Sequence, residues 1–330
     1  MRSDVGPPHD DASTSVSPVM TRSHLSLATV VVVWAGSFSV IKALLDHGFA
    51  ATDIAVLRYA VAAPGFAVVL LRARGLPGLT RSDAVRIVAA GVLVVLGYHI
   101  ALNVGESHTT SGVAALVVAL APAMTLVLAV ALGLERLVVR RALGLVVAFA
   151  GVAVVIVLGT GEQLSFASVK GPLIVLVAPL SFALYNVLLK PLFARHDLLA
   201  LTAASSLVGT IALLPLVGSS TVGTVTDISA EDVLLVLYLG VLATLLGYIG
   251  WNVGLRGLGP TRAVAYAYAI SPLAVVIGTV TLGEQLTRWL VVGAALVVGG
   301  IAAAQGSELL GLARRLGSVR VRGRAHAHDA

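Results

Sequence analysis

Long apolar segments, separated by short polar clusters, run through most of the chain. Ten such segments can be counted, each of about 18 to 22 residues and so long enough to cross a hydrocarbon core of about 30 Å. A segment inside lipid must satisfy its own backbone hydrogen bonds, so each is predicted to form a helix. The predicted spans are residues 25–45, 54–72, 84–104, 112–133, 140–159, 171–190, 198–217, 232–253, 262–282 and 287–305. We therefore expect an all-α integral membrane protein with ten transmembrane helices.

The third, fourth and fifth spans are repeated in the eighth, ninth and tenth. Matching residues lie 149 or 150 positions apart: Tyr98 and Tyr248, Asn103 and Asn252, Pro122 and Pro272, Glu135 and Glu284, Gly144 and Gly293, and Gly151 and Gly300. A repeat of half the chain in so apolar a sequence is typical of a transporter built from two halves. Each half holds five spans, and because five is odd, the two halves enter the membrane from opposite sides. The repeats are thus predicted to be inverted.

Basic residues indicate which way the chain crosses the membrane. With the N-terminus inside, 17 of the 22 Lys and Arg residues fall in cytoplasmic loops or tails, and only Lys170 and Arg288 fall in outer loops. This excess of positive charge predicts that both termini are cytoplasmic. We expect a multi-pass protein of the inner (plasma) membrane.

The composition agrees with a bilayer environment. The chain is 58% hydrophobic and 12% charged, whereas about a quarter of the residues of a soluble domain are charged. The net charge of +6 does not indicate nucleic acid, because the basic residues are spread over loops and the C-terminal tail, where they would face anionic lipid. Without cysteine, the sequence excludes disulfides, thiolate metal sites and cysteine nucleophiles. It has no Walker motif, and we expect no cofactor and no metal.

Four regions are predicted along the chain. They are a disordered cytoplasmic tail at 1–23, five-helix repeats at 24–160 and 161–306, and a basic cytoplasmic tail at 307–330. The segment after Gln305 is expected to begin as an amphipathic helix at the membrane surface and then to fray.

Short motifs in both halves point to a known family. The first half contains Trp34-Ala-Gly-Ser37-Phe38, Arg58, Ser111-Gly-Val-Ala-Ala-Leu with Pro122 beyond it, and Leu134-Glu135-Arg136; the second contains Asn252, Pro272 and Gly283-Glu284-Gln285. Over residues 25–305 this doubled pattern resembles two EamA units of the drug/metabolite transporter superfamily. Two positions depart from it, because Phe182 stands where Trp34 would be repeated and Ser206 where Arg58 would be.

The resemblance implies a ten-helix inner-membrane carrier, usually an exporter of amino acids, metabolites or drugs, with a central cavity lined by helices 1, 3, 4, 6, 8 and 9. Polar and aromatic residues concentrate in these helices: Trp34, Ser37, Tyr98, His99, Asn103, Tyr185, Asn186, Tyr248, Trp251, Asn252, Tyr266 and Tyr268. Their side chains offer stacking surface and hydrogen bonds, which suits an amphipathic or zwitterionic solute. The alternative is that they form interfacial aromatic belts and interhelical contacts.

Two ionisable residues inside the spans are candidates for function. Arg58 either gates the path or contacts substrate, or else it snorkels to the outer interface or holds a loop carboxylate such as Asp53. His99, the only intramembrane histidine of the predicted spans, is a candidate for coupling protons to export. A neutral histidine, hydrogen-bonded between helices, is the favoured interpretation.

Acidic residues are absent from the middle of the predicted spans. Glu106, Glu135 and Glu284 occur at predicted span ends, where water relieves the cost of a charge, so a buried carboxylate relay is not expected. Glu135 and Glu284 are predicted to cap or anchor the turns after spans 4 and 9, with ion coupling as the alternative. Pro122 and Pro272 lie about mid-span, where they are either hinges for alternation or static bends.

A secondary transporter is the predicted function, most simply an exporter of small metabolites, amino acids or drugs that works by alternating access. Its partners would be a small-molecule substrate and the lipid bilayer, with transport driven either by a proton gradient or simply downhill, and it would be a monomer or a homodimer. Uptake by the same fold is the alternative. An enzyme is not expected, because HExxH, a serine elbow and a deep carboxylate pair are all missing from the sequence. A channel would need a continuous polar stripe or a filter loop, which the sequence lacks.

Overall fold

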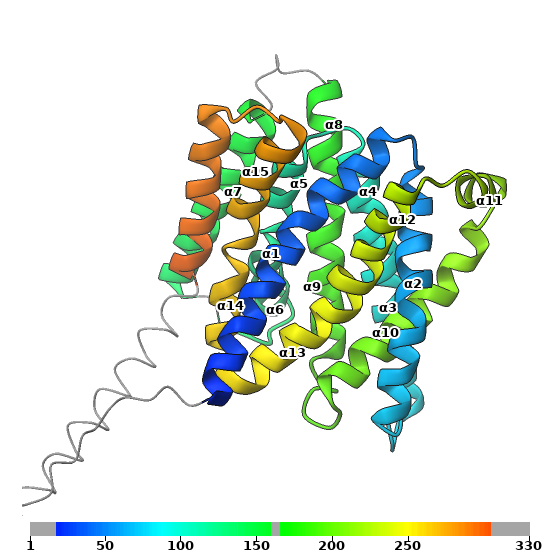
Figure 1. The fold of residues 1–330 in the computed structure, drawn as a ribbon. Coiled ribbons are helices and arrows are strands. Elements are labelled where there is room, and N and C mark those ends of the chain that lie inside the picture. Colours follow the sequence, from blue (N-terminus) through cyan, green and yellow to red (C-terminus); the bar gives the residue numbers. More distant parts are fainter. Residues whose placement is uncertain (1–17, 137, 160–165, 305–330) are drawn as a thin grey trace, which may run out of the picture.

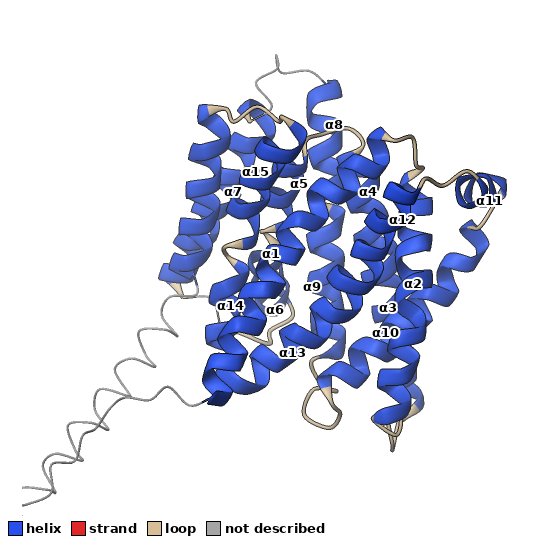
Figure 2. Cartoon of the chain, viewed as in Figure 1, coloured by secondary structure: helices blue, strands red, loops and turns tan. Residues whose placement is uncertain are grey.

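A computed structural model describes residues 18–136, 138–159 and 166–304. Within these residues the regular structure is helical and contains no strand (Figure 2). Nine helical stretches of the described residues are long and apolar enough to cross a membrane, and Arg288–Ala304 is a shorter apolar helix. The prediction of an all-helical membrane protein with ten spans is confirmed.

The first repeat runs from span 1 to span 5. Its helices are α1 (Pro18–Asp46), α2 (Ala51–Arg72), α3 (Arg81–Val92) with η1 (Leu93–Ile100) and α4 (Ala101–Glu106), α5 (Ser111–Val118) with α6 (Ala121–Ala131), and α7 (Val139–Leu158). Three elements form span 3, and two form span 4. Spans 1, 2 and 5 are single helices.

The second repeat has the same order. Its helices are α8 (Phe166–Val175) with α9 (Val177–Leu189), α10 (Leu198–Leu213) with η2 (Leu214–Leu216), α12 (Ala230–Leu237) with η3 (Tyr238–Leu246) and α13 (Gly247–Leu258), α14 (Pro260–Ala267) with α15 (Ile270–Leu282), and the last helix, Arg288–Ala304. A short helix, α11 (Ser219–Thr226), lies in the connection between spans 7 and 8.

Polar caps mark where the spans begin. The hydroxyl groups of Thr80, Thr110 and Ser229 accept from backbone N–H groups at the starts of α3, α5 and α12. At the start of α3, Asp83 completes a capping box by accepting from the backbone N–H of Thr80. These contacts satisfy donors that the first turn of a helix cannot pair internally, so the polar clusters between the apolar segments set the helix ends.

Equivalent spans of the two repeats make equivalent packing contacts. Span 1 packs against spans 8 and 9, through α13 and α15, and its repeat mate, span 6, packs against spans 3 and 4, through η1 and α6. Spans 2 and 7 pack against each other, as do spans 4 and 9. In Figure 1, α1 runs from the lower to the upper end of the bundle, whereas α8 and α9 run from the upper to the lower end. This is the arrangement of inverted repeats.

Spans 3 and 8 share a π-helical segment, η1 in one and η3 in the other. A π-helical turn widens the helix and frequently lies at a functional site. In η3, the Oγ1 of Thr244 donates a hydrogen bond to the carbonyl of Leu239, five residues earlier, at 2.8 Å. At the repeat offset of 149 residues the two segments overlap in part, so both repeats have this irregularity in the same span.

Spans 5 and 10 approach so closely that only glycine fits at their contact. A Cβ atom on Gly144 would lie 2.4 Å from the backbone nitrogen of Ala304, and one on Gly300 would lie 2.4 Å from that of Ala148. Small residues allow such backbone contact between membrane helices. The last helix therefore packs directly on α7, as Figure 1 shows.

The start of span 1 differs from the sequence-based prediction. α1 begins at Pro18, so residues 18–23, which were assigned to a disordered tail, are helical. The extra turn is held against span 8, because Ser23 Oγ donates to the carbonyl of Val253 and Ser26 Oγ to that of Gly250. The rest of that tail (1–17), the boundary between the repeats at 160–161 and the amphipathic helix expected after Gln305 lie outside the described residues.

Candidate functional site

Aromatic rings from five spans form one cluster between the repeats. Trp34 of span 1 contacts Trp251 and Tyr248 of span 8, with ring centroids 5.4 and 6.0 Å apart, and Tyr248 contacts Phe66 of span 2 at 6.2 Å. A second run of rings continues through Tyr59, His99, Tyr98, Phe182 and Tyr185, with centroids 4.8 to 6.0 Å apart. These nine residues are called the aromatic cluster below.

The two runs belong together. Tyr59, Phe66 and Tyr185 share one buried hydrophobic core, against which Phe182 and Tyr248 pack. Trp34, Tyr98, Tyr185 and Trp251 were predicted to line a cavity, and the structure does bring them together. Rings of span 2, Tyr59 and Phe66, join them. Sequence reasoning missed these rings; the position of Tyr59 next to Arg58 is the signal that could have found the first of them.

Arg58 is the buried charge beside the aromatic cluster. The side chain of Arg58, in span 2, is buried, and its Nε donates to Thr244 Oγ1 of span 8 at 2.6 Å. Asp53 does not neutralise it, because that carboxylate accepts from Ser220 Oγ at 2.7 Å and Thr221 Oγ1 at 2.6 Å. The alternatives that Arg58 snorkels or holds Asp53 are therefore wrong. A fixed cation is left within the protein.

The charge of Arg58 lies beside the cluster. Arg58 directly precedes Tyr59 in α2, and its partner Thr244 is four residues before Tyr248 in span 8. A cation next to aromatic faces and phenol groups can attract a carboxylate while the rings contact the apolar part of the same solute. The site thus combines a positive charge with apolar surface.

His99 sits inside the aromatic cluster without a hydrogen bond. Its ring is buried between Tyr59 and Tyr98, and neither ring nitrogen has a partner among the described residues. The favoured interpretation, a histidine hydrogen-bonded between helices, is therefore wrong, since its interhelical contacts are aromatic.

The side chains of several predicted cavity residues donate hydrogen bonds to backbone carbonyl groups. Trp34 Nε1 donates to the carbonyl of Ala243 at 2.8 Å, and Ser37 Oγ to that of Trp34 at 2.7 Å. The amide groups of Asn186 and Asn252 each donate to the carbonyl four residues earlier, at 2.8 and 2.9 Å. These bonds orient the side chains of the cluster and its rim.

Three predicted residues lie away from the cluster. Asn103 donates to the carbonyl of Ala51 at 3.0 Å, where span 2 begins. Tyr266 forms a hydrogen bond of 2.6 Å with His24 Nδ1, near the start of α1. Tyr268 and Pro272 line a hollow of about 620 Å³ that also touches Val298 of the last helix.

The prolines mark breaks in their helices. Span 4 is interrupted at residues 119–120 and span 9 at 268–269, and Pro122 and Pro272 lie in the first turns of α6 and α15. Proline is tolerated in the first turn because its missing N–H would be unpaired there. The matched breaks are a structural feature of both repeats.

The turns after spans 4 and 9 differ in what their glutamates do. Glu284 accepts from the backbone N–H groups of Ser111 and Gly112 at 2.6 and 3.1 Å, so it caps span 4 from the other repeat. Glu135 instead pairs with Arg141 at 3.2 Å and with Lys190 at 3.7 Å. Both contacts agree with the predicted role as caps or anchors.

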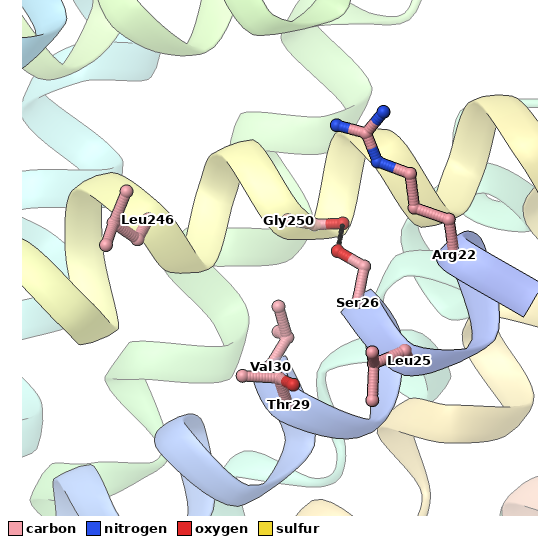
Figure 3. A pocket seen from close by; sticks show the side chains of 7 residues that line it. All are labelled: Arg22, Leu25, Ser26, Thr29, Val30, Leu246 and Gly250. Carbon is pink, nitrogen blue, oxygen red and sulfur yellow. Dashed lines mark hydrogen bonds between the residues drawn. The ribbon is translucent and has the colours of Figure 1, made fainter.

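The groove in Figure 3 is separate from the aromatic cluster. It has a volume of about 290 Å³ and lies between α1 and span 8, with Arg22 at one end and Leu25, Thr29, Val30 and Leu246 along it. The Ser26 bond to Gly250, at 3.0 Å, crosses it. Among the described residues no group of three or more His, Asp or Glu could hold a metal ion.

The family model of EamA-like transporters matches the chain twice, over residues 21–157 and 169–304. The chain belongs to the EamA-like transporter family. It is a multi-pass membrane transporter, and its substrate is a small molecule. An intramembrane enzyme, which the missing motifs argued against, is not what this family contains.

Curated relatives of this EamA-like transporter are themselves named as transporters. An "Uncharacterized transporter" of Archaeoglobus fulgidus is 30% identical over 275 residues, which cover 83% of this chain and 95% of that protein. A "Probable terminal-alkyne amino-acid exporter" of Streptantibioticus cattleyicolor is 30% identical over 285 residues, or 86% and 93% of the two chains. A crystal structure with 20% sequence identity shares the fold, with a TM-score of 0.56 over 88% of this chain and 96% of that one.

Proposed function

We propose that this transporter exports a small amphipathic solute with a carboxylate group, and that amino acids are the first class to test. The observation that carries the proposal is Arg58. It is buried, its Nε donates to Thr244 of the other repeat, and it directly precedes Tyr59 of the aromatic cluster in α2. A buried charge is costly in a bilayer, so its retention beside an interhelical cluster supports a role in binding. Export is supported by the name of the Streptantibioticus cattleyicolor relative.

Alternating access would use the contacts that join the repeats. Spans 1 and 6 pack across the repeat boundary, on spans 8 and 9 and on spans 3 and 4 respectively. Rocking of one repeat on the other would open the aromatic cluster to one membrane side at a time. The breaks before Pro122 and Pro272 would be the hinges, and unchanged transport in the Pro122→Ala, Pro272→Ala double variant would contradict this role.

The orientation follows from the loops. The α2–α3 connection, with Arg72, Arg74 and Arg81, and the α9–α10 connection, with Arg195, lie at the lower end of the bundle in Figure 1, as does the start of α1. We infer that this end is cytoplasmic in the plasma membrane. Because the chain has no cysteine, single cysteines can report it: Ser107→Cys is expected to react with an impermeant maleimide in intact cells, and Arg136→Cys only after permeabilisation. The reverse labelling would overturn the orientation.

Transport into inside-out vesicles tests the function. Vesicles would be offered amino acids, nucleosides and dyes, with and without a pH gradient. Uptake of at least one carboxylate-bearing solute is expected, and its loss in Arg58→Leu but not in the matched Ser206→Ala variant would assign binding to Arg58. If nucleosides or dyes move and amino acids do not, the substrate class is wrong. If no solute moves, the carrier function itself is contradicted.

A further inference from the structure

Glu106 is a fully buried carboxyl group at the end of span 3. Its side chain has 0% exposure, and neither carboxyl oxygen has a hydrogen-bond or ion-pair partner among the described residues. The expectation that water reaches this residue is wrong, because the α4–α5 turn and the neighbouring helices enclose it. A buried carboxylate without a donor is highly unfavourable, so this group requires a ligand or a proton.

Asn103 offers a hydrogen-bond acceptor that favours a protonated Glu106. Asn103 and Glu106 are three residues apart and therefore lie on the same face of α4. The Nδ2 of Asn103 donates to the carbonyl of Ala51, which leaves Oδ1 buried and unpaired. A protonated Glu106 has an O–H that can donate to such an acceptor, whereas an ionised one has nothing to donate.

The charged groups of the elements beside α4 are already engaged. α1, which packs against α4, carries Lys42 and Asp46, and the loop that caps α5 carries Glu284. Lys42 is already paired with Asp46 at 2.9 Å. Glu284 is held in place by the two backbone N–H groups of span 4.

Other charged or titratable groups on elements that pack against α4 are engaged elsewhere or exposed. Asp53 accepts from Ser220 and Thr221, and Arg58 donates to Thr244. Lys170 of α8 is exposed to solvent. Tyr98 and His99 of η1 lie within the aromatic cluster. None of them supplies Glu106 with a counter-ion in this structure.

We propose that Glu106 is the proton-binding site of this transporter: it holds a proton while it is enclosed, as here, and exchanges it with water when the α4–α5 turn separates from span 1 and the Glu284 loop. This inference rests on the proposed transport function and assigns its coupling ion to one residue. The repeat mate of Glu106 is Leu255. The site is therefore present once, at the upper end of the bundle, and the two repeats do not share it.

Infrared spectroscopy tests the protonation without any substrate. The full-length protein in lipid nanodiscs would be titrated from about pH 5 to about pH 9, a range in which exposed carboxyl groups are ionised. A C=O stretching band of a protonated carboxylic acid is expected to persist at neutral pH and to disappear in Glu106→Gln. The matched control Glu284→Gln is expected to keep the band. Persistence of the band in Glu106→Gln, or its absence from the wild type, overturns the proposal.

Two further measurements keep the result decisive. Glu106→Gln replaces a neutral carboxyl group by a neutral amide of the same shape, so the variant is expected to elute from size-exclusion chromatography as a folded protein. If the variant does not fold, the wild-type protein is treated instead with dicyclohexylcarbodiimide, which modifies protonated carboxyl groups. Mass spectrometry then shows whether Glu106 is modified, and an unmodified Glu106 contradicts the proposal. Loss of the band when sodium replaces choline in the buffer would show a sodium site instead and overturn the proton assignment. Failure of the proposed function is a separate outcome, since vesicles would then move no solute even though the band is present.

Discussion

The two repeats share a scaffold but carry different chemistry, and the clearest case is a pair of ionic contacts at opposite ends of the bundle. Asp83 and Asp232 lie 149 residues apart, each in the first turn of the third helix of its repeat. At the lower end, Asp83 pairs with Arg195, which follows span 6, at 2.8 and 3.1 Å. At the upper end, Asp232 pairs with His47, which follows span 1, at 2.6 Å.

The difference between these contacts is the titratable partner. Arginine stays charged at all physiological pH values, whereas histidine changes charge near neutrality. The hydrogen bond with Asp232 raises the pKa of His47 above its ordinary value, and the nearby carboxylates add to this effect. The upper contact therefore responds to pH and the lower one does not. The inverted repeat copies the geometry of a contact without copying its response.

The largest effect is expected from the charge that only the first repeat has. Arg58→Leu removes a buried, charge-assisted hydrogen bond to Thr244 and the cation beside the aromatic cluster, which corresponds to a roughly 10- to 100-fold loss of transport. The matched Ser206→Ala variant should transport within about twofold of the wild type. Vesicle uptake rates measure both. Equal losses in the two variants would show that the repeats are functionally equivalent.

A smaller effect is expected where the repeats are equivalent. Gly144→Val and Gly300→Val each force a side chain against backbone atoms across the contact between spans 5 and 10. Each should lower the free energy of unfolding by about 1 to 3 kcal/mol, as overpacking does. Thermal unfolding in detergent measures it, with Gly299→Val as control, since a Cβ at Gly299 has no atom within 4 Å. A marked loss in one variant alone would contradict the symmetric packing.

The His47 contact gives a pH-dependent effect of at most about 1 kcal/mol, because the His47 side chain is 41% exposed and solvent screens the pair. The pKa of His47 is raised in the folded state, so its stabilisation is fully present below about pH 6.5 and is lost as the pH rises through the raised value. His47→Ala should remove this pH dependence, and His47→Arg should keep the contact at every pH. Melting temperatures measured across pH would contradict the assignment if His47→Ala left the slope unchanged.

The smallest effects are expected from the helix caps. Thr80→Ala and Ser229→Ala each remove the hydroxyl group that accepts from the third residue of the following helix, at 3.2 and 3.1 Å. Each should cost about 1 kcal/mol of unfolding free energy. Chemical denaturation measures the two losses, which should be similar. A loss confined to one cap would show that the two repeats start this helix differently.

Much of the fold could be predicted from the chain, because each span must be apolar over about the thickness of the bilayer. The position of the aromatic rings was predicted in part: Trp34, Tyr98, Tyr185 and Trp251 meet in the cluster, whereas Tyr266 bonds to His24 near the start of α1. Whether a ring faces a neighbour or the lipid depends on helix rotation. In an apolar span that rotation has almost no periodic signal, because lipid and protein core favour the same side chains.

The partners in the two ionic contacts could not be predicted from the sequence either. Asp83 and Asp232 are separated by the repeat offset of 149 residues, so the sequence alone could have identified them as equivalent positions. Their partners, Arg195 and His47, follow the first spans of opposite repeats, and only the folded chain puts them in contact. Contacts between loops distant in sequence depend on how the repeats pack, which no local pattern encodes.

By itself, the sequence determined the solvent, the number of spans, the duplication and the inversion, because these follow from hydropathy, residue identity and the parity of the helix count. Only the tertiary structure decided the state of Glu106 and Arg58. Burial depends on neighbours that come from other spans, and a residue at the predicted end of a helix can be wet or fully enclosed. The structure encloses Glu106 and buries Arg58 with Thr244 as its hydrogen-bond partner, and both proposals depend on those two facts.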